Sequence, residues 1–255
     1  MVPCALTIAS SDSGGGAGIQ ADLKAFAAAG CHGMSAIVAL TAQNTTGVTA
    51  IYELPPEFVT AQLDALFDDI GVDAAKTGML FSARLIETVA DFLEQHHVPL
   101  VVDPVMVASS GAKLLEDDAV DALVTRLFPL ATVVTPNRDE AKVLVGQGDP
   151  DEQARRLVDL GAAAAIVTGA GAGDHFFDGQ TALEIPVRRH DVAATHGSGC
   201  THSATLAALL ARGEDLLTAG TLAAATASDA VEHGLDELGS GAGPVDVFHL
   251  EGGGR

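Results

Sequence analysis

Short apolar segments alternate with longer amphipathic segments along most of this chain. A short apolar run is typical of a strand buried in a parallel sheet, and apolar residues spaced three and four apart indicate a helix that covers the sheet. The pattern predicts strands at residues 4–9, 35–40, 74–77, 100–102, 133–135 and 164–168, and one near an edge at 48–54. It predicts helices at residues 19–29, 56–69, 83–95, 118–128 and 151–160.

The alternation changes after residue 168. Residues 175–177 and 181–187 flank the pair Asp178-Gly179, which predicts an antiparallel hairpin added to the sheet. Alanine-rich helices are expected at 199–211 and 215–233, and residues 251–255 are expected to fray. No repeat, linker or change of composition divides the sequence. We therefore expect one domain over residues 1–255, a three-layer α/β/α fold around a mostly parallel sheet.

The charge balance argues against nucleic acid and membranes as partners. The 255 residues include 34 acidic and 13 basic side chains, a formal net charge of −21, which repels phosphate backbones and anionic lipid surfaces. The longest uncharged stretch, residues 25–52, contains Gln43 and Asn44, so we interpret it as buried interior and not as a membrane span. The acid-rich, lysine-poor surface fits plain solubility or a high-salt habitat.

The cysteines and the N-terminus bear on the compartment. Cys4, Cys31 and Cys200 form no Cys-x-x-Cys pair, which argues against a disulfide scaffold or a thiolate zinc site. The apolar N-terminal run follows no basic segment and does not resemble a signal peptide. We expect a soluble, cytoplasmic protein.

Two polar segments follow predicted strands near the N-terminus. The loop at residues 10–18 includes Gly14, Gly15, Gly16 and Gly18, which let backbone N–H groups approach a ligand; a flexible connection is the alternative. Gln43 follows the strand at 35–40, where open α/β sheets bind ligands, although it equally fits a turn.

A second pair of polar segments follows two central strands. Asp103 comes directly after one of them, and Asn137 and Glu140 come after the next. Asn137 and Glu140 are three residues apart at a predicted helix start, where they could hold a hydrated Mg²⁺ near phosphates. The same spacing equally predicts a capping box, with Asn137 as the N-cap residue.

The most specific segment is Thr195-His196-Gly197-Ser198-Gly199-Cys200-Thr201, at the start of a predicted helix. Glycines before a helix N-terminus leave backbone N–H donors free for an anion. Cys200 would lie in the first turn, where the helix dipole lowers the pKa of a thiol. The alternative is a buried structural cysteine.

Together these motifs resemble the ribokinase superfamily, and within it the hydroxymethylpyrimidine/phosphomethylpyrimidine kinases of thiamine biosynthesis. The resemblance extends over nearly the whole chain. Its motifs are Gly-Gly-Ala-Gly-Ile-Gln-Ala-Asp-Leu-Lys (15–24), Thr-Ala-Gln-Asn-Thr (41–45), Lys-Thr-Gly-Met-Leu (76–80), Val-Asp-Pro-Val-Met (102–106), Thr-Pro-Asn-x-x-Glu (135–140) and His-Gly-Ser-Gly-Cys-Thr (196–201). A cysteine after the glycine pair, where most of the superfamily has aspartate, resembles this branch and some pyridoxal kinases.

The resemblance implies ATP- and Mg²⁺-dependent phosphorylation of a hydroxymethylpyrimidine and then of its monophosphate, by a protein we expect to be a homodimer. It implies a role for each matching residue. The pyrimidine would be bound by Asp22, Gln43, Met79, Val105 and Gly15. The phosphoryl group would lie in an anion hole of Gly197, Ser198 and Gly199 beside Cys200 as base or positioning group. The nucleotide would contact Asn137, Thr168 and Gly169, and Mg²⁺ would contact Asp103 and Glu140.

The sequence departs from the family pattern at a few positions. The family commonly has Lys-Gly-Gly-His after the late strand, whereas this chain has Thr168-Gly169-Ala170-Gly171, so a cationic contact to ATP is absent. His202 stands where leucine is common. Two rival functions are pyridoxal kinase activity and a non-catalytic pyrimidine sensor.

Overall fold

The computed structural model of the chain describes residues 1–106, 118–169 and 173–250. Its strands form a single nine-stranded sheet in the order β3-β2-β1-β4-β5-β6-β7-β8-β9. Their bounds are β1 (Cys4–Asp12), β2 (His32–Asn44), β3 (Gly47–Glu53), β4 (Ala74–Thr77), β5 (Leu100–Val102), β6 (Val133–Val134), β7 (Ala165–Val167), β8 (Gly173–Phe177) and β9 (Ala182–Pro186). The strands from β2 to β7 in that order are parallel, whereas β3, β8 and β9 pair antiparallel at the two edges.

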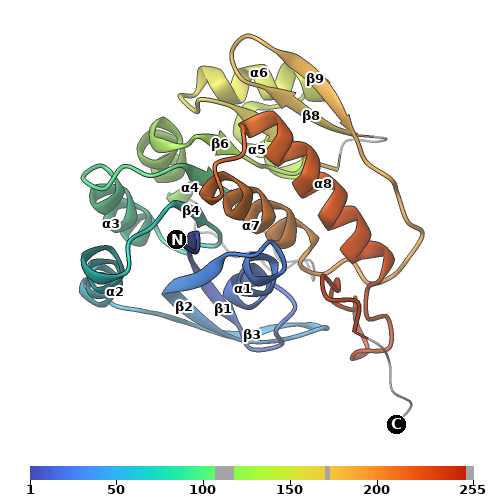
Figure 1. Cartoon of the computed structure of the whole chain (residues 1–255), viewed down its shortest axis with the longest axis horizontal. Helices are drawn as coiled ribbons and strands as arrows, with labels where there is room; N and C mark the ends of the chain where they lie inside the picture. The colour runs from blue at the N-terminus through green and yellow to red at the C-terminus, as the bar shows by residue number, and fades with distance from the viewer. Residues whose placement is uncertain (107–117, 170–172, 251–255) are drawn as a thin grey trace.

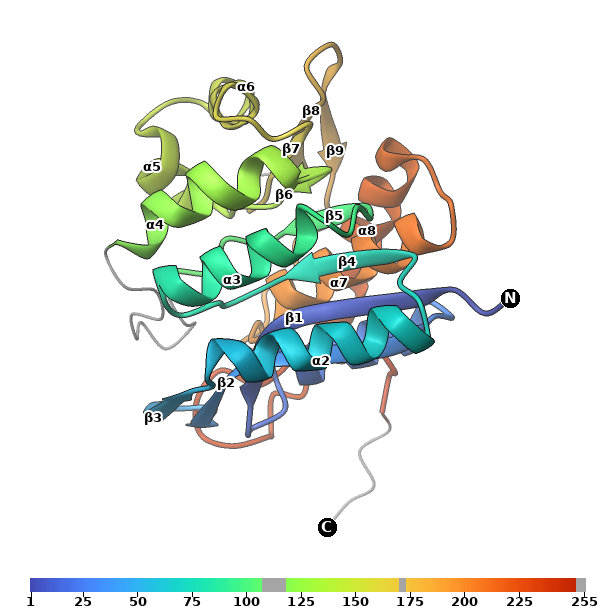
Figure 2. The same ribbon diagram turned by 90° about the vertical axis from the view of Figure 1, so that its left-hand side faces the viewer.

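Helices cover both faces of this sheet, which gives the three layers expected (Figures 1 and 2). The helices are α1 (Gly18–Ala28), α2 (Pro56–Asp69), α3 (Ala83–Leu93), α4 (Ala119–Ala122), α5 (Arg138–Val145), α6 (Pro150–Asp159), α7 (Ser198–Ala211) and α8 (Leu216–Glu232). One apolar core lies between the sheet and α2, α3 and α4, and a second lies between the sheet and α1, α7 and α8. The α/β/α prediction is confirmed.

Most predicted elements appear within one or two residues of their predicted ends, but three differ in a physically informative way. β1 continues to Asp12 and β2 to Asn44, so polar residues assigned to loops extend the strands beyond their apolar centres. The predicted helix 118–128 is a single α-helical turn followed by a π-helical segment (Leu123–Leu127) and a 3-10 segment (Phe128–Leu130). Pro129 cannot continue an α-helix, which accounts for the irregular end.

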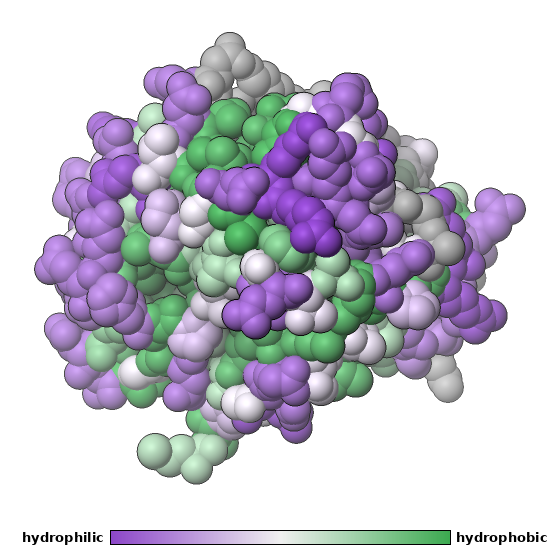
Figure 3. Space-filling model, turned by 90° about the horizontal axis from the view of Figure 1, so that it is seen from above, coloured by the Kyte–Doolittle hydropathy of each residue, from purple (hydrophilic) through white to green (hydrophobic). Residues whose placement is uncertain are grey.

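The surface carries both hydrophilic and apolar side chains. In the face shown in Figure 3, hydrophilic side chains cover much of the surface, with apolar ones exposed between them. Among the described helices, none has the length and apolar content needed to cross a bilayer. The tail expected to fray, residues 251–255, lies outside the described residues.

Candidate active site

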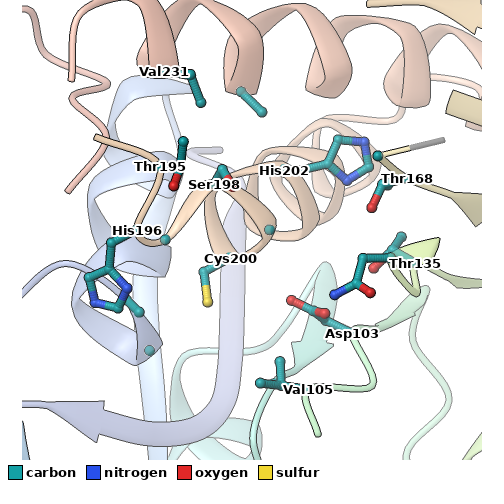
Figure 4. A pocket seen from close by; sticks show the side chains of 18 of the residues that line it. Asp103, Val105, Thr135, Thr168, Thr195, His196, Ser198, Cys200, His202 and Val231 are labelled. Atoms are coloured by element: carbon teal, nitrogen blue, oxygen red, sulfur yellow. The ribbon is translucent and has the colours of Figure 1, made fainter. Parts of the chain in front are cut away.

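A cavity of about 500 Å³ lies over the carboxyl ends of the parallel strands. Ligands of open α/β sheets bind at this edge because loops and helix N-termini converge there. The cavity is bordered at one end by Gln43, Met79 and Val105, and at the other by Thr168, Gly169 and Asp174. The N-terminus of α7 lies between these ends (Figure 4).

Most of the predicted site residues meet in this one cavity although they are far apart in the sequence. Those that line it are Gln43, Met79, Asp103, Val105, Asn137, Glu140, Thr168, Gly169, Gly197, Ser198, Gly199 and Cys200. Asp22 and Gly15 do not line it. Contact of these two residues with a ligand therefore stays a prediction.

Asp22 and Gly15 both have hydrogen-bond partners within the protein. Asp22 is fully buried in α1, where its carboxylate accepts hydrogen bonds from the Thr7 hydroxyl at 2.6 Å and from the Lys76 ammonium at 3.0 Å. Gly15 turns the loop after β1 with a φ of 76°, and its carbonyl accepts from Lys24 Nζ at 2.8 Å. The sequence places both residues near the site but cannot show which way they face.

Lys76 is the principal residue without a predicted role. It lies on β4, is fully buried, and its ammonium is 3.0 Å from Asp22 Oδ1 and 3.6 Å from Asp103 Oδ2. Burial alone would lower the pKa of Lys76, but Asp22, Cys200 and Asp103 together raise it, so the side chain is a cation at neutral pH. The available signal was a lysine inside the buried strand Ala-Ala-Lys-Thr.

Cys200 projects from the first turn of α7 toward Asp103 and Val105 (Figure 4). Burial raises the pKa of its thiol to about 12; Lys76 opposes this rise, whereas Asp22 and Asp103 add to it. The expectation that the helix dipole lowers this pKa is therefore wrong, because desolvation and two carboxylates outweigh the dipole. In the ligand-free protein the group is a neutral thiol.

The glycine loop after β1 packs directly against the start of α7. Gly197 has a φ of 83°, and a Cβ added there would lie 1.8 Å from the carbonyl oxygen of Gly16. Asp12 organises the loop, since its carboxylate accepts from the backbone N–H groups of Gly14, Gly16 and Ala17 at 2.8–3.1 Å. The same carboxylate is 3.2 Å from His196 Nε2. Asp12 and His196 thus connect the glycine loop to the segment that precedes α7, a role for which the sequence carried no separate signal.

Asn137 and Glu140 form the capping box and also line the cavity. Asn137 Oδ1 accepts from the backbone N–H groups of Asp139 and Glu140, and Glu140 Oε2 accepts from the N–H group of Asn137 at 2.9 Å. Burial, followed by the charge of Asp103, raises the pKa of Glu140 to about 8, although backbone N–H groups of Asn137 and Met106 oppose the rise. The two open interpretations are therefore compatible: the capping geometry is present, and two carboxylates that repel each other face the cavity.

These carboxylates fit a divalent cation. Mg²⁺ is bound through one or two carboxylates together with substrate phosphates. A cation near Asp103 and Glu140 would relieve the repulsion that raises the pKa of Glu140. Asp103 Oδ2 is held by the hydroxyl of Ser203 at 2.8 Å, which orients the group.

A cavity at the carboxyl edge of a mostly parallel sheet, with a glycine-flanked helix N-terminus at its centre, defines a small-molecule kinase of the ribokinase-like fold. The phosphomethylpyrimidine kinase family matches residues 12–246. The chain belongs to this family, and it is an enzyme.

Individual relatives agree with this assignment. The hydroxymethylpyrimidine/phosphomethylpyrimidine kinase of Rhizobium meliloti (strain 1021) is 48% identical over 98% of each chain. Among solved structures, Bacillus subtilis pyridoxal kinase in an ADP complex has a TM-score of 0.89 at 37% identity and covers 96% of this chain and 97% of its own. The phosphomethylpyrimidine kinase of Clostridium difficile 630 has a TM-score of 0.77 at 37% identity, with 87% of this chain and 97% of its own covered.

Proposed function

We propose that this kinase transfers the γ-phosphoryl group of ATP to 4-amino-5-hydroxymethyl-2-methylpyrimidine, and then transfers a second one to the resulting monophosphate, in thiamine diphosphate biosynthesis. The observation that carries the proposal is the position of Cys200 and the α7 N-terminus between two ends of one cavity. One end suits a small heteroaromatic ring and the other suits a nucleotide.

The ring is assigned to the end formed by Gln43, Met79 and Val105. Thr41 Oγ1 lies 3.1 Å from the side-chain oxygen of Gln43, which leaves the Gln43 amide N–H groups for a ring nitrogen. Met79 and Val105 add apolar surface. One amide edge between apolar side chains matches a ring that carries both nitrogens and methyl groups.

The transferring phosphoryl group is assigned to the start of α7. Gly197 and Gly199 bring to a helix N-terminus backbone N–H groups that have no acceptor within the described residues, an arrangement that stabilises negative charge, whereas the N–H of Ser198 donates to the carbonyl of Thr195 at 3.3 Å. The cationic Lys76 lines the same cavity and interacts electrostatically with Cys200. Because phosphoryl transfer passes through a loose transition state, positioning and charge matter more than a strong base. We therefore assign to the neutral Cys200 thiol a hydrogen bond that aims the attacking hydroxyl.

The nucleotide is assigned to the opposite end. Asn137, Thr168 and Gly169 line the cavity there, and the connection between β9 and α7 faces α8 to form a slot. That slot is apolar at Val187, Ala224, Ala227 and Val231. Such a surface suits the flat base of a nucleotide. Mg²⁺ would be held by Asp103 and Glu140 and would neutralise phosphate charge when bound.

The expected homodimer and cytoplasmic location stay predictions alongside this proposal. Size-exclusion chromatography with light scattering would give the number of chains in the particle, and fractionation of the source cells would give the compartment.

Kinase assays on alternative acceptors test the proposal. Purified protein with ATP and Mg²⁺ should convert the hydroxymethylpyrimidine with a kcat/KM at least tenfold above that for pyridoxal. Omitting Mg²⁺ and adding a chelator should abolish conversion. A preference for pyridoxal would replace the proposed substrate with the rival one, and ligand binding without turnover of any acceptor would indicate a sensor.

A further inference from the structure

His202 is a buried imidazole that lines the nucleotide end of the cavity. It lies in α7 two residues after Cys200 and is 5% exposed. Its Nε2 atom is buried and has no hydrogen-bond partner within the described residues. Figure 4 shows the ring reaching from α7 toward Thr168, on the side of Cys200 opposite to His196.

Asp174 is the nearest acidic group, yet it does not satisfy this nitrogen. Asp174 Oδ2 is 3.8 Å from His202 Nε2, which is too long for a hydrogen bond. Asp174 Oδ1 accepts from the backbone N–H of Gly169 at 3.2 Å, and this bond ties the carboxylate to the loop after β7. The carboxylate can therefore orient the imidazole electrostatically while the nitrogen stays available.

A second polar atom without a partner lies at the same end. The hydroxyl of Thr135, which also lines the cavity, is buried and has no partner within the described residues. Leaving such buried polar atoms unsatisfied is costly, so native structures pair them with protein, water or ligand. An imidazole N–H and a hydroxyl in one cavity wall can both donate hydrogen bonds to anionic oxygens.

We propose that His202, oriented by Asp174, donates a hydrogen bond to a phosphate oxygen of the bound nucleoside triphosphate. This rests on the proposed function, in which ATP enters at this end. It also accounts for two unusual positions at once, because His202 and the uncharged Thr168 both line the end of the cavity to which the phosphates are assigned.

The charges around the ring agree with this role. Burial lowers the pKa of His202, whereas Asp174 and Asp103 raise it. Asp174 itself is faced by His202, His175 and Arg189, which lower its pKa against the rise caused by burial. The ring is thus a neutral donor held near a carboxylate, and a neutral ring can be replaced by another neutral donor.

Binding measurements on the intact protein test this proposal. His202→Leu removes the hydrogen-bond donor, and His202→Gln keeps an N–H donor. The matched control is His32→Leu, at an exposed position. His32 is the first residue of β2, at the opposite end of that strand from Gln43. Calorimetry would give affinities for a non-hydrolysable ATP analogue, for adenosine and for the pyrimidine.

We expect His202→Leu to lower the affinity for the ATP analogue by about 10–100-fold, which corresponds to the loss of one hydrogen bond to a charged group. Affinities for adenosine and the pyrimidine should stay within about twofold, His202→Gln should recover most of the loss, and His32→Leu should match the wild type. Unchanged affinity of His202→Leu for the analogue, or equal losses for adenosine or the pyrimidine, would overturn the proposal. Failure of the proposed function would appear separately, as absent pyrimidine turnover by the wild type.

Discussion

Replacing Lys76 by methionine should destabilise the fold strongly, because it removes one partner from a fully buried ion pair. The ammonium of Lys76 is 3.0 Å from Asp22 and 3.6 Å from Asp103. After the substitution, the one side-chain donor that Asp22 keeps among the described residues is the Thr7 hydroxyl, at 2.6 Å. Removing one partner of a buried pair costs about 3–5 kcal/mol.

The loss should depend on pH in a defined direction. Burial raises the pKa of Asp22, and Lys76 holds that rise in check, so the pKa rises further in the variant. A carboxyl whose folded pKa is raised contributes stability below its unfolded pKa, near 3.9, and loses it as pH rises through the folded value. The variant should therefore be closest to the wild type near pH 5 and furthest from it near pH 8. Lys76 itself has a raised pKa and stays charged between pH 5 and pH 8, so its own titration does not make the wild-type stability depend on pH in this range.

Urea unfolding followed by circular dichroism measures the effect. With a slope of about 3 kcal/mol per molar urea, the midpoint at pH 8 should fall by about 1–2 M. Lys142→Met, which breaks an exposed pair with Asp139, should cost less than about 1 kcal/mol. The double variant Lys76→Met/Asp22→Asn should recover part of the loss, because the charge of Asp22 is removed while the buried Asp103, which keeps the Ser203 hydroxyl, still lacks its cation. A midpoint shift below about 0.3 M at pH 8, or an equal shift at both pH values, would refute this reasoning.

Three further substitutions test the site. Gly197→Ala should lower the free energy of unfolding by more than about 2 kcal/mol in urea, because its Cβ would meet the Gly16 carbonyl. The control Gly213→Ala has a similar positive φ but open space around it, and should lower the free energy of unfolding by about 1 kcal/mol; equal losses would contradict the packing argument. Glu140→Gln keeps an acceptor for the capping box, so Tm should hardly change. The Mg²⁺ concentration that gives the half-maximal rate should rise at least tenfold, because a carboxylate is lost from the cation site. An unchanged Mg²⁺ dependence would mean that Glu140 has only a structural role. Cys200→Ala, which removes the hydrogen bond that aims the hydroxyl, should lower kcat by about 10-fold with little change in ligand affinity, whereas Cys200→Ser keeps a neutral hydrogen-bonding group and should lose less. A near-normal kcat for Cys200→Ala would remove the thiol from the reaction.

The sequence was sufficient for the parts of the fold that depend on local burial. The segments at β4 and β5 are short and fully buried because both sheet faces are covered, and their ends were predicted to the residue even though β4 carries Lys76 and Thr77. The segment after Asp118 was not, because the change from α- to π- and 3-10-helical turns depends on how it meets Pro129 and the core. Residues at strand ends were also placed correctly, since parallel strands bring their carboxyl ends to one edge.

The properties that the sequence did not reveal arise from contacts between distant segments. The rotation of α1 against β4 decides whether the Asp22 side chain points into the cavity or toward Lys76. The periodicity of α1 does not determine this rotation. The pKa of Cys200 depends on desolvation and on carboxylates contributed by other elements, so the local helix dipole was a misleading guide. The partner of Gly197 is a carbonyl about 180 residues away in the chain, at Gly16.

A crystal structure of the protein with the hydroxymethylpyrimidine, Mg²⁺ and a non-hydrolysable ATP analogue tests the central claim most directly. The account predicts the pyrimidine between Gln43 and Val105, its hydroxyl next to Cys200, and the triphosphate running from Thr168 to the N–H groups at Gly197–Gly199. A pyrimidine bound at the Thr168 end, or a terminal phosphate directed away from the start of α7, would contradict it.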